Sequence, residues 1–176
     1  MRHLVRFIFL LILYSTQALA NETHLVELIV FRQSSENLYS GKVAPDNWAL
    51  NATHISANMQ RTPRLKYLAD KLTPEKGYEI ILHKAWLQNS PQGSARIALK
   101  QGEQHFNHYP IEGTLDFSQG RPHSVLLELW INQFDAHQAI IRSEHFKQGS
   151  VLLNEQVTFI DHGNLGALIR IQPQIQ

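Results

Sequence analysis

Histidines and carboxylates are the side chains that could do chemistry in this 176-residue sequence, which contains no cysteine. Asp161 and His162 are adjacent, and an aspartate beside a histidine is typical of an oriented general base. The same two residues belong to an Asp-His-Gly-Asn tetrapeptide, which is typical of a tight turn. The interpretation that we favour is turn chemistry, with Asp161 capping the reversal and His162 exposed.

Other catalytic arrangements find little support. His105 and His108 could share a metal ion if they lay on a helix, but their flanks indicate a solvated loop pair. Glu112 and Glu128 lie on predicted neighbouring strands, as the two acids of a glycosidase could, yet nothing nearby indicates a raised pKa. No serine-nucleophile motif occurs, and the absence of cysteine excludes thiol chemistry. We therefore predict a protein that is not an enzyme, with no metal and no cofactor.

The first twenty residues match a secretory signal peptide. Arg2 and Arg6 make a positive N-terminal region, residues 5–14 are an apolar run with little polar interruption, and Ala18-Leu19-Ala20 is a small-residue cleavage motif. The apolar run is shorter than the roughly 20 residues that span a bilayer. We expect cleavage after Ala20, a periplasmic location, and no membrane span in the mature chain.

The mature chain, residues 21–176, suits a single domain. The signal peptide holds two of the 16 Lys and Arg residues and none of the 15 Asp and Glu residues, which leaves a net charge of −1. Nucleic-acid binding needs a clustered basic surface, so it is not expected.

Hydrophobic periodicity predicts an α+β domain with a mostly antiparallel sheet of about eight short strands and one short helix near 63–72. Residues 24–32 are apolar on both faces, which indicates a central strand covered on both sides. Residues 156–171 read as strand, tight turn and strand. The remaining strands are expected at 78–88, 95–100, 111–117, 125–131, 139–146 and 151–156, with Lys147-Gln148-Gly149 as a turn between the last two.

Three features leave alternatives open. Residues 78–88 fit a helix as well as a strand, although the isoleucines and aromatic ends favour a strand. Gly113 could mark a β-bulge. Trp48, in the polar segment 34–62, could pin that segment to the core or present an exposed ring to a sugar or peptide. His83, two residues from Ala85, is expected to be partly buried and bonded to the backbone.

Several segments resemble the CsiV family of periplasmic peptidoglycan-binding proteins of Gammaproteobacteria. The matching pieces are Glu27-Leu-Ile-Val-Phe31, Leu82-His-Lys-Ala-Trp-Leu-Gln88, Glu128-Leu-Trp130, and Ile160-Asp-His162 leading to Gly166-Ala-Leu-Ile169. They keep the family's order across almost the whole mature chain. The final hairpin departs from the family pattern at Thr158, Phe159 and Gly163, and 151–154 lacks the usual arginines, so the chain resembles a divergent member.

The resemblance implies a non-enzymatic accessory of cell-wall synthesis. Such a protein binds peptidoglycan and supports a class A penicillin-binding protein through its outer-membrane lipoprotein activator. Glycan recognition uses aromatic faces and fixed polar groups, so we expect one patch formed by His83, Trp86 and Gln88 with Asp161 and His162. The alternatives are an envelope adaptor that does not bind the wall and a wall hydrolase.

Overall fold

The computed structural model describes residues 23–33, 37–89, 93–118, 120, 122–153 and 155–174. The predicted signal peptide and its cleavage site lie outside these residues. The strands are β1 (Thr23–Gln33), β2 (Thr53–His54), β3 (Gln60–Arg61), β4 (Tyr78–Asn89), β5 (Ser94–Gln101), β6 (Ile111–Ser118), β7 (His123–Phe134), β8 (Ile140–Leu152), β9 (Thr158–His162) and β10 (Leu165–Pro173). The helical segments are α2 (Lys66–Ala69) and the 3-10 turn η1 (Pro74–Lys76).

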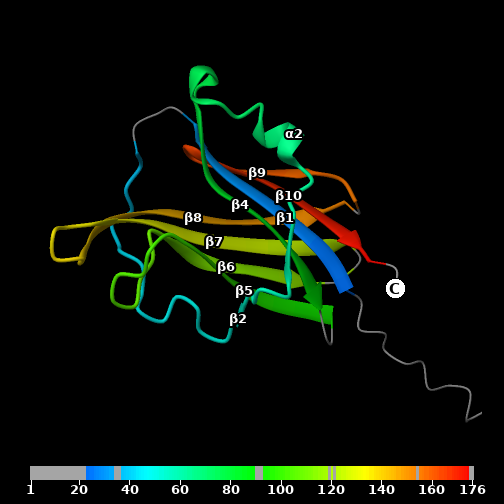
Figure 1. Ribbon diagram of the computed structural model, residues 1–176, viewed down its shortest axis with the longest axis horizontal. Coiled ribbons are helices and arrows are strands. Elements are labelled where there is room, and N and C mark those ends of the chain that lie inside the picture. The colour runs from blue at the N-terminus through cyan, green and yellow to red at the C-terminus, as the bar shows by residue number, and fades with distance from the viewer. Residues whose placement is uncertain are drawn as a thin grey trace, which may run out of the picture.

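Ten strands form two five-stranded sheets that lie face to face (Figure 1). The first sheet has the order β3-β4-β1-β10-β9, and the second has the order β2-β5-β6-β7-β8. Every described pairing of named strands is antiparallel except that of β2 with β5, which is parallel. The expected antiparallel architecture is confirmed, with two more strands than predicted.

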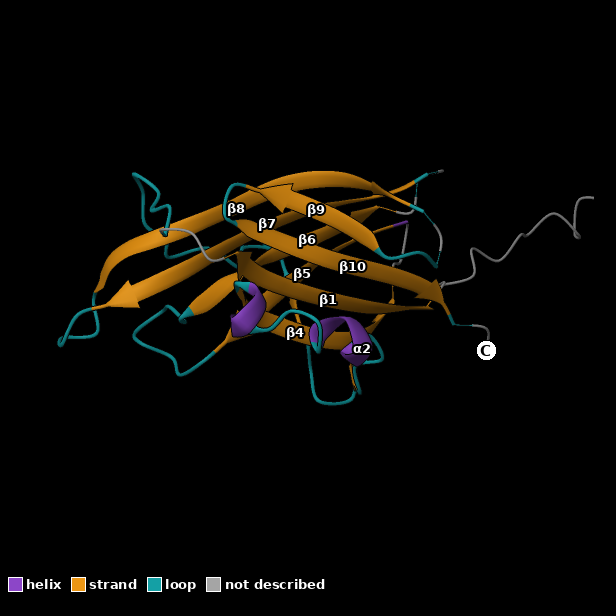
Figure 2. Cartoon of the chain, turned by 90° about the horizontal axis from the view of Figure 1, so that it is seen from above, coloured by secondary structure: helices purple, strands orange, loops and turns teal. Residues whose placement is uncertain are grey.

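A single large core fills the space between the sheets. Alternate residues of each strand point inward, because successive side chains of a strand face opposite sides. Val26, Leu28 and Val30 of β1 meet Leu127 and Leu129 of β7 in this cluster. Viewed from above in Figure 2, β4, β1, β10 and β9 form one layer and β5 to β8 lie behind it.

Strand β1 is covered on both faces, as its sequence predicted. Its second face carries Ile29 and Phe31, which pack against Leu65 and Ala69 of the α2 segment. Figure 2 shows α2 lying on the outside of this layer. The buried carboxylate of Glu27 accepts hydrogen bonds from the backbone N–H groups of Arg64 and Leu65, at 3.0 and 2.6 Å, and so fixes the start of that segment.

The fold class is mainly β rather than α+β, because the predicted helix over 63–72 shrinks to the four residues of α2. After Ala69 the chain continues in turns in which Lys71 and Leu72 donate to the carbonyls of Leu68 and Ala69, three residues back. The apolar side chains of the predicted stripe do pack on β1, but one helical turn is enough to cover it.

Two strand predictions are wrong in detail. Strand β8 runs unbroken through residues 147–149, because these residues stay paired with β7: Lys147 lies opposite Glu128 and Gly149 opposite Leu126. Gly113 forms no bulge, since β6 keeps its register with both neighbours. A Cβ atom at Gly113 would lie 2.0 Å from the carbonyl oxygen of Glu128, so glycine is needed for the close approach of β7.

Residues 78–88 are a strand, as favoured, but the strand changes phase. The pairing with β1 shifts between Val30 and Phe31, which leaves Ile81 as an extra residue opposite them. Such a bulge turns the following side chains to the other face. Tyr78 therefore packs outside, whereas Leu82 and Trp86 belong to the inner core. This phase change explains why the apolar pattern fitted a helical face as well as a strand face, because Ile81 and Leu82 are adjacent in sequence and both belong to the inner core.

The C-terminal hairpin is confirmed. His162 pairs with Leu165, which leaves Gly163 and Asn164 as a two-residue turn. Gly163 has a φ of +65°, a conformation that glycine adopts without a steric penalty.

Candidate functional site

Strand β4 carries three of the five predicted site residues but does not place them on one face. Trp86 is fully buried in the inner core, and its Nε1 donates to Oε1 of the buried Gln88 at 3.2 Å. His83 faces the opposite side, where its Nε2 lies 2.9 Å from Oε1 of Glu27. The partner of His83 is therefore a carboxylate and not the backbone.

Asp161 and His162 lie at the far edge of the same sheet. Strands β1 and β10 separate β9 from β4, which places them three strand spacings apart, or about 14 Å. Trp86 is paired with Val26 of β1, and Val26 is paired with Ile171 of β10. His162 is paired with Leu165 of β10, six residues before Ile171, and this offset adds about 20 Å along the strands. The prediction of a single patch that contains both Trp86 and His162 is therefore wrong, because the two residues lie too far apart on the sheet.

The hairpin residues have separate surroundings. Asp161 and His162 belong to β9 and not to the turn itself. Asp161 is exposed, but His162 is half-buried and not exposed as expected, because its ring lies 5.5 Å from the ring of Phe146. His162 also lines a cavity of about 220 Å³ together with Leu38 and Tyr39. A role of either residue in ligand binding stays a prediction.

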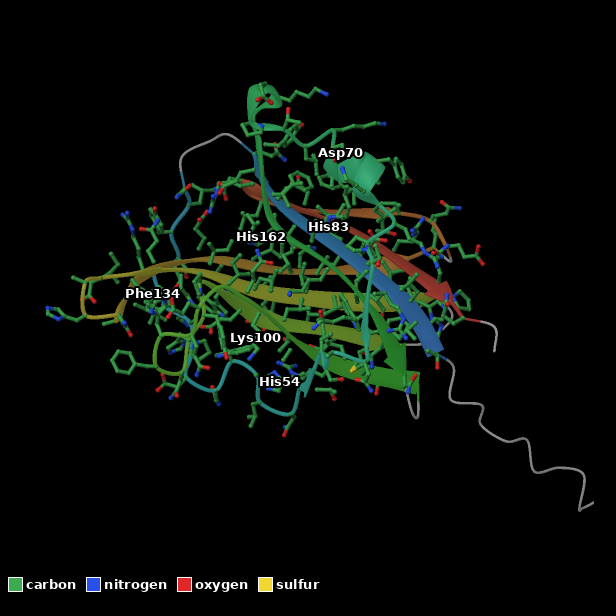
Figure 3. All side chains as sticks on the ribbon, in the orientation of Figure 1. His54, Asp70, His83, Lys100, Phe134 and His162 are labelled. Atoms are coloured by element: carbon green, nitrogen blue, oxygen red, sulfur yellow. The ribbon has the colours of Figure 1, made fainter. Side chains whose placement is uncertain are left out.

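His83 lines a groove between β4 and β5, where the edges of the two sheets approach each other. The groove encloses about 330 Å³. We call it the cationic groove and define it by its polar lining, which consists of His54, Gln60, Arg61, His83, Lys84 and Lys100. Among the residues that the structure describes, no aspartate or glutamate lines it. Figure 3 labels three of these residues, His54, His83 and Lys100.

A strap formed by residues 53–61 carries the chain across this seam. At one end β2 pairs with β5 of the second sheet, and at the other end β3 pairs with β4 of the first. Ile55 and Met59 pack against the inner core, and the Met59 carbonyl accepts a hydrogen bond from the N–H of Leu87 at 2.8 Å. Because the strap is anchored at both sheets, it holds His54 and Arg61 at the rim of the groove.

Local contacts orient two of the groove cations. Nη1 of Arg61 donates to the carbonyls of Asn58 and Gln60 at 2.8 and 2.7 Å. Nζ of Lys100 donates to the hydroxyl of Tyr109 at 2.7 Å and lies 4.3 Å from the centre of its ring. Both side chains are thereby restrained before any ligand arrives.

Lys84 differs from these two cations because it is half-buried, whereas they are exposed. Burial lowers the pKa of Lys84, since a charged ammonium is poorly solvated there. Of the five predicted site residues, only His83 shares this groove. The basic groups around it were missed because His54, Arg61 and Lys100 are distant in sequence, although Lys84, between the apolar residues Leu82 and Trp86 of a predicted strand, was a signal.

A second cavity of about 230 Å³ lies on the outer face of the second sheet, lined in part by Trp48, Trp130, Arg96 and Glu128. Trp48 is half-buried, and its Nε1 donates to the carbonyl of Asn107 at 3.1 Å. Trp48 is therefore pinned to a neighbouring loop while part of its ring stays accessible.

Aromatic contacts connect the second cavity to the cationic groove. The ring of Trp48 lies 6.0 Å from the ring of Tyr109 and 6.3 Å from that of His54, both edge-on. Tyr109 in turn holds Lys100. A row of rings therefore runs between two hollows of the surface, an arrangement suited to an elongated ligand with apolar faces and charged groups.

The two carboxylates considered for glycoside hydrolysis do not face a common cavity. Glu112 is completely buried and accepts hydrogen bonds from Asn132 and from the backbone N–H of Tyr109, both at 2.8 Å. Burial raises the pKa of Glu112, which its sequence neighbours did not indicate. Glu128 lines the second cavity. Burial by itself raises the pKa of Glu128, but interactions with Lys147 and His145 outweigh burial, so the pKa is lowered.

The histidine pair is also not a solvated loop pair. His108 lies 2.6 Å from Glu112 and 3.0 Å from Asp46, and the ring of His105 packs 4.4 Å from that of Phe134. No cluster of three or more metal-ligating side chains occurs among the described residues. In the same part of the chain, no helix is both long and apolar enough to cross a membrane.

The fold and the groove together define a small two-sheet domain with a groove lined by basic side chains. A family model described as "Peptidoglycan-binding protein, CsiV" matches residues 54–174, a range that contains all six polar groove residues. The chain belongs to this CsiV family. No curated protein and no solved structure matches the chain significantly.

Proposed function

We propose that this chain is a periplasmic protein that binds peptidoglycan and serves as a non-enzymatic accessory of cell-wall synthesis. The observation that carries the proposal is the family match over residues 54–174, because that family is described as peptidoglycan-binding. The cationic groove and the row of rings beside it support a binding role. Peptidoglycan is a polymer of amino sugars and acidic peptides. The aromatic rings can contact its sugars, and the cations can pair with the carboxylates of its peptides.

Wall binding is tested by sedimentation with purified murein sacculi. We expect the chain, purified from the periplasm of an expression host, to pellet with sacculi and to stay in solution with cellulose at the same mass. A chain that stays in solution with both would contradict wall binding and support the alternative, an adaptor of the cell envelope. Clearing of a murein zymogram would instead indicate the hydrolase alternative.

The proposal includes secretion, with cleavage after Ala20. Intact-mass measurement of the periplasmic protein checks this directly, because the expected mature chain begins at Asn21. A mass that retains the first twenty residues would contradict the predicted cleavage site.

The finer role is support of a class A penicillin-binding protein through its outer-membrane lipoprotein activator, as the family resemblance implies. We expect immobilised mature chain to retain such a protein or its activator from a membrane extract, with or without muramidase treatment. Retention lost after muramidase would mean that the wall alone links the proteins. In that case the direct partnership would be wrong.

A further inference from the structure

We infer that the cationic groove is a subsite for the carboxylate groups of the peptide stems of peptidoglycan. This inference rests on the proposed function and deepens it, because it names the part of the polymer that the groove recognises. The chemistry is that of ammonium, guanidinium and imidazole groups that surround a short acidic peptide.

The charge of the lining selects the anionic part of the ligand. Arg61, Lys84 and Lys100 each carry a positive charge at neutral pH, and no described acidic side chain lines the groove to neutralise them. The mature chain as a whole has a net charge of −1, so this concentration of positive charge is local. The amino-sugar backbone of peptidoglycan is uncharged where its lactyl groups are joined to peptide. Its free carboxylates belong to the stems.

The carboxylate that contacts His83 is already engaged. Glu27 is buried behind His83 and accepts hydrogen bonds from the N–H groups of Arg64 and Leu65 as well as contacting Arg170 at 3.5 Å. Glu27 positions the ring of His83 from behind, and among the described residues no carboxylate forms an ion pair with Arg61, Lys84 or Lys100. A ligand carboxylate can supply the counter-ion.

Lys84 is the group that profits most from such a ligand. Its ammonium is partly withdrawn from water and forms no ion pair with any described residue. A charge in such a place is costly unless it is paired. A carboxylate placed in the groove would pair it, and the restrained side chains of Arg61 and Lys100 would lose little further freedom on binding.

The size of the groove also favours a short peptide segment. At about 330 Å³ it is at the small end of ligand sites, which are commonly about 300–1,000 Å³. It suits one or two carboxylate-bearing residues better than a run of sugar rings. The neighbouring row of Trp48 and Tyr109 is available for the remainder of the polymer.

The test is a titration of the isotope-labelled mature chain, followed by two-dimensional NMR, with three soluble probes. The first probe is the stem peptide L-Ala-γ-D-Glu-meso-diaminopimelate, the second is its carboxamide derivative, and the third is the stem-free disaccharide. Inorganic phosphate at equal ionic strength shows the effect of any anion. We expect only the acidic peptide to shift amide signals of the strap and of β4 around Lys84 in a saturable way.

Variants make the assignment specific. Arg61→Gln combined with Lys84→Gln should weaken peptide binding by roughly tenfold or more, since it removes two of the three charges that would pair with the carboxylates of the peptide. Lys71→Gln combined with Lys76→Gln removes the same charge from exposed positions outside the groove and should leave the affinity unchanged. Thermal unfolding of each variant confirms that it is folded.

The outcomes separate this inference from the proposed function. Equal responses to the acidic peptide and its carboxamide, or groove shifts with the disaccharide instead, would overturn the carboxylate subsite. If sacculi still pellet the protein, wall binding would stand. Phosphate shifts as large as those of the peptide would reduce the groove to a general anion site and would also overturn the inference. Absence of both peptide binding and pelleting would overturn both proposals.

Discussion

At the scale of single residues, Lys84 and Gly113 occupy positions where the surroundings leave few alternatives. Lys84 is a half-buried cation on a strand whose neighbours Leu82 and Trp86 belong to the core. Gly113 lies where the β6 and β7 backbones approach too closely for any side chain. The first residue is costly for the free protein, and the second is required for the sheet to form.

Replacing Lys84 by methionine should stabilise the free protein and weaken wall binding. Methionine keeps the aliphatic stem and removes the poorly solvated charge, so we expect the Tm at neutral pH to rise by a few degrees. Because the folded-state pKa of Lys84 lies below its unfolded value of about 10.4, wild-type stability should rise as pH increases between those two values. The Lys84→Met variant should lack this rise in thermal unfolding scans. A lower Tm in the variant would mean that a stabilising partner holds Lys84.

Gly113→Ala should destabilise the protein by at least about 3 kcal/mol or prevent folding, because its Cβ would lie 2.0 Å from the Glu128 carbonyl oxygen. Gly41→Ala is the matched control, since no atom lies within 4 Å of its Cβ position. Chemical denaturation of the two variants measures the difference. Equal stabilities would show that β6 and β7 can move apart at little cost.

At the scale of elements, β4 has two functions on its two faces. Its inner face contributes Trp86 to the core, and its outer face contributes His83 to the groove. Strand alternation produces this division, because His83 and Trp86 lie three residues apart on the same side of the bulge at Ile81. The carbonyl of that extra residue is satisfied from outside the strand pair, because it accepts a hydrogen bond from Nε2 of Gln101 on β5 at 3.1 Å.

Trp86→Ala should therefore act on stability and not on a binding surface. Removal of a fully buried indole costs about 3–5 kcal/mol. We expect a large fall in the free energy of unfolding, while the fraction that remains folded binds sacculi with unchanged affinity. Binding measured well below the Tm, beside chemical denaturation, checks both statements. Loss of affinity in a fully folded variant would return Trp86 to the list of ligand-binding residues.

The loop around Asp46 and Trp48 should be held more firmly at low pH. Burial by itself lowers the pKa of His108, but interactions with Glu112 and Asp46 outweigh it and raise the pKa. A raised folded-state pKa gives stabilisation that is fully present below the unfolded value of about 6.5 and lost as pH rises through the folded value.

The stability difference between wild type and His108→Gln measures this contribution. We expect the difference to be larger at about pH 6 than at about pH 9 in chemical denaturation. Quenching of Trp48 fluorescence by an added quencher should increase in the wild type as the pH rises from about 6 to about 9, provided that Trp86 and Trp130 stay shielded from the quencher. A difference that grows with pH would contradict the raised pKa.

At the scale of the whole molecule, a buried polar clamp joins the two sheets. Arg32 of β1 contacts Glu144 of β8 at 2.5 Å, and the side chain of Asn164 donates to the same carboxylate at 3.2 Å. Arg32 also pairs with Glu79, which is largely exposed, whereas the Glu144 side chain is 1% exposed. One guanidinium therefore has one buried partner and one exposed partner.

This geometry predicts very different costs for two identical substitutions. Glu144→Gln leaves Arg32 without its buried counter-ion and should cost about 3–5 kcal/mol. Glu79→Gln removes an exposed partner and should cost less than about 1 kcal/mol. Denaturant unfolding of both variants in parallel gives the comparison. Similar costs would show that the clamp does not hold the sheets together.

The sequence by itself determined the features that depend on local periodicity. The two-sided apolar pattern of residues 24–32 predicted a covered central strand, and the alternation around Gly163 predicted the C-terminal hairpin. Each pattern is read from neighbouring residues, and a side chain's face follows from its position in the strand. The family resemblance came from the same source, because it rests on short segments in a conserved order.

Only the tertiary structure decided where those elements meet. The pairing of the strap with two different sheets joins His54 and Arg61 to His83, and no local pattern encodes such an edge contact. The bulge at Ile81 and the register of β4, β1, β10 and β9 move Trp86 inward and His162 away. Faces reverse with a one-residue shift of register. The sequence thus determined the strands, whereas long-range pairing determined which side chains share the groove.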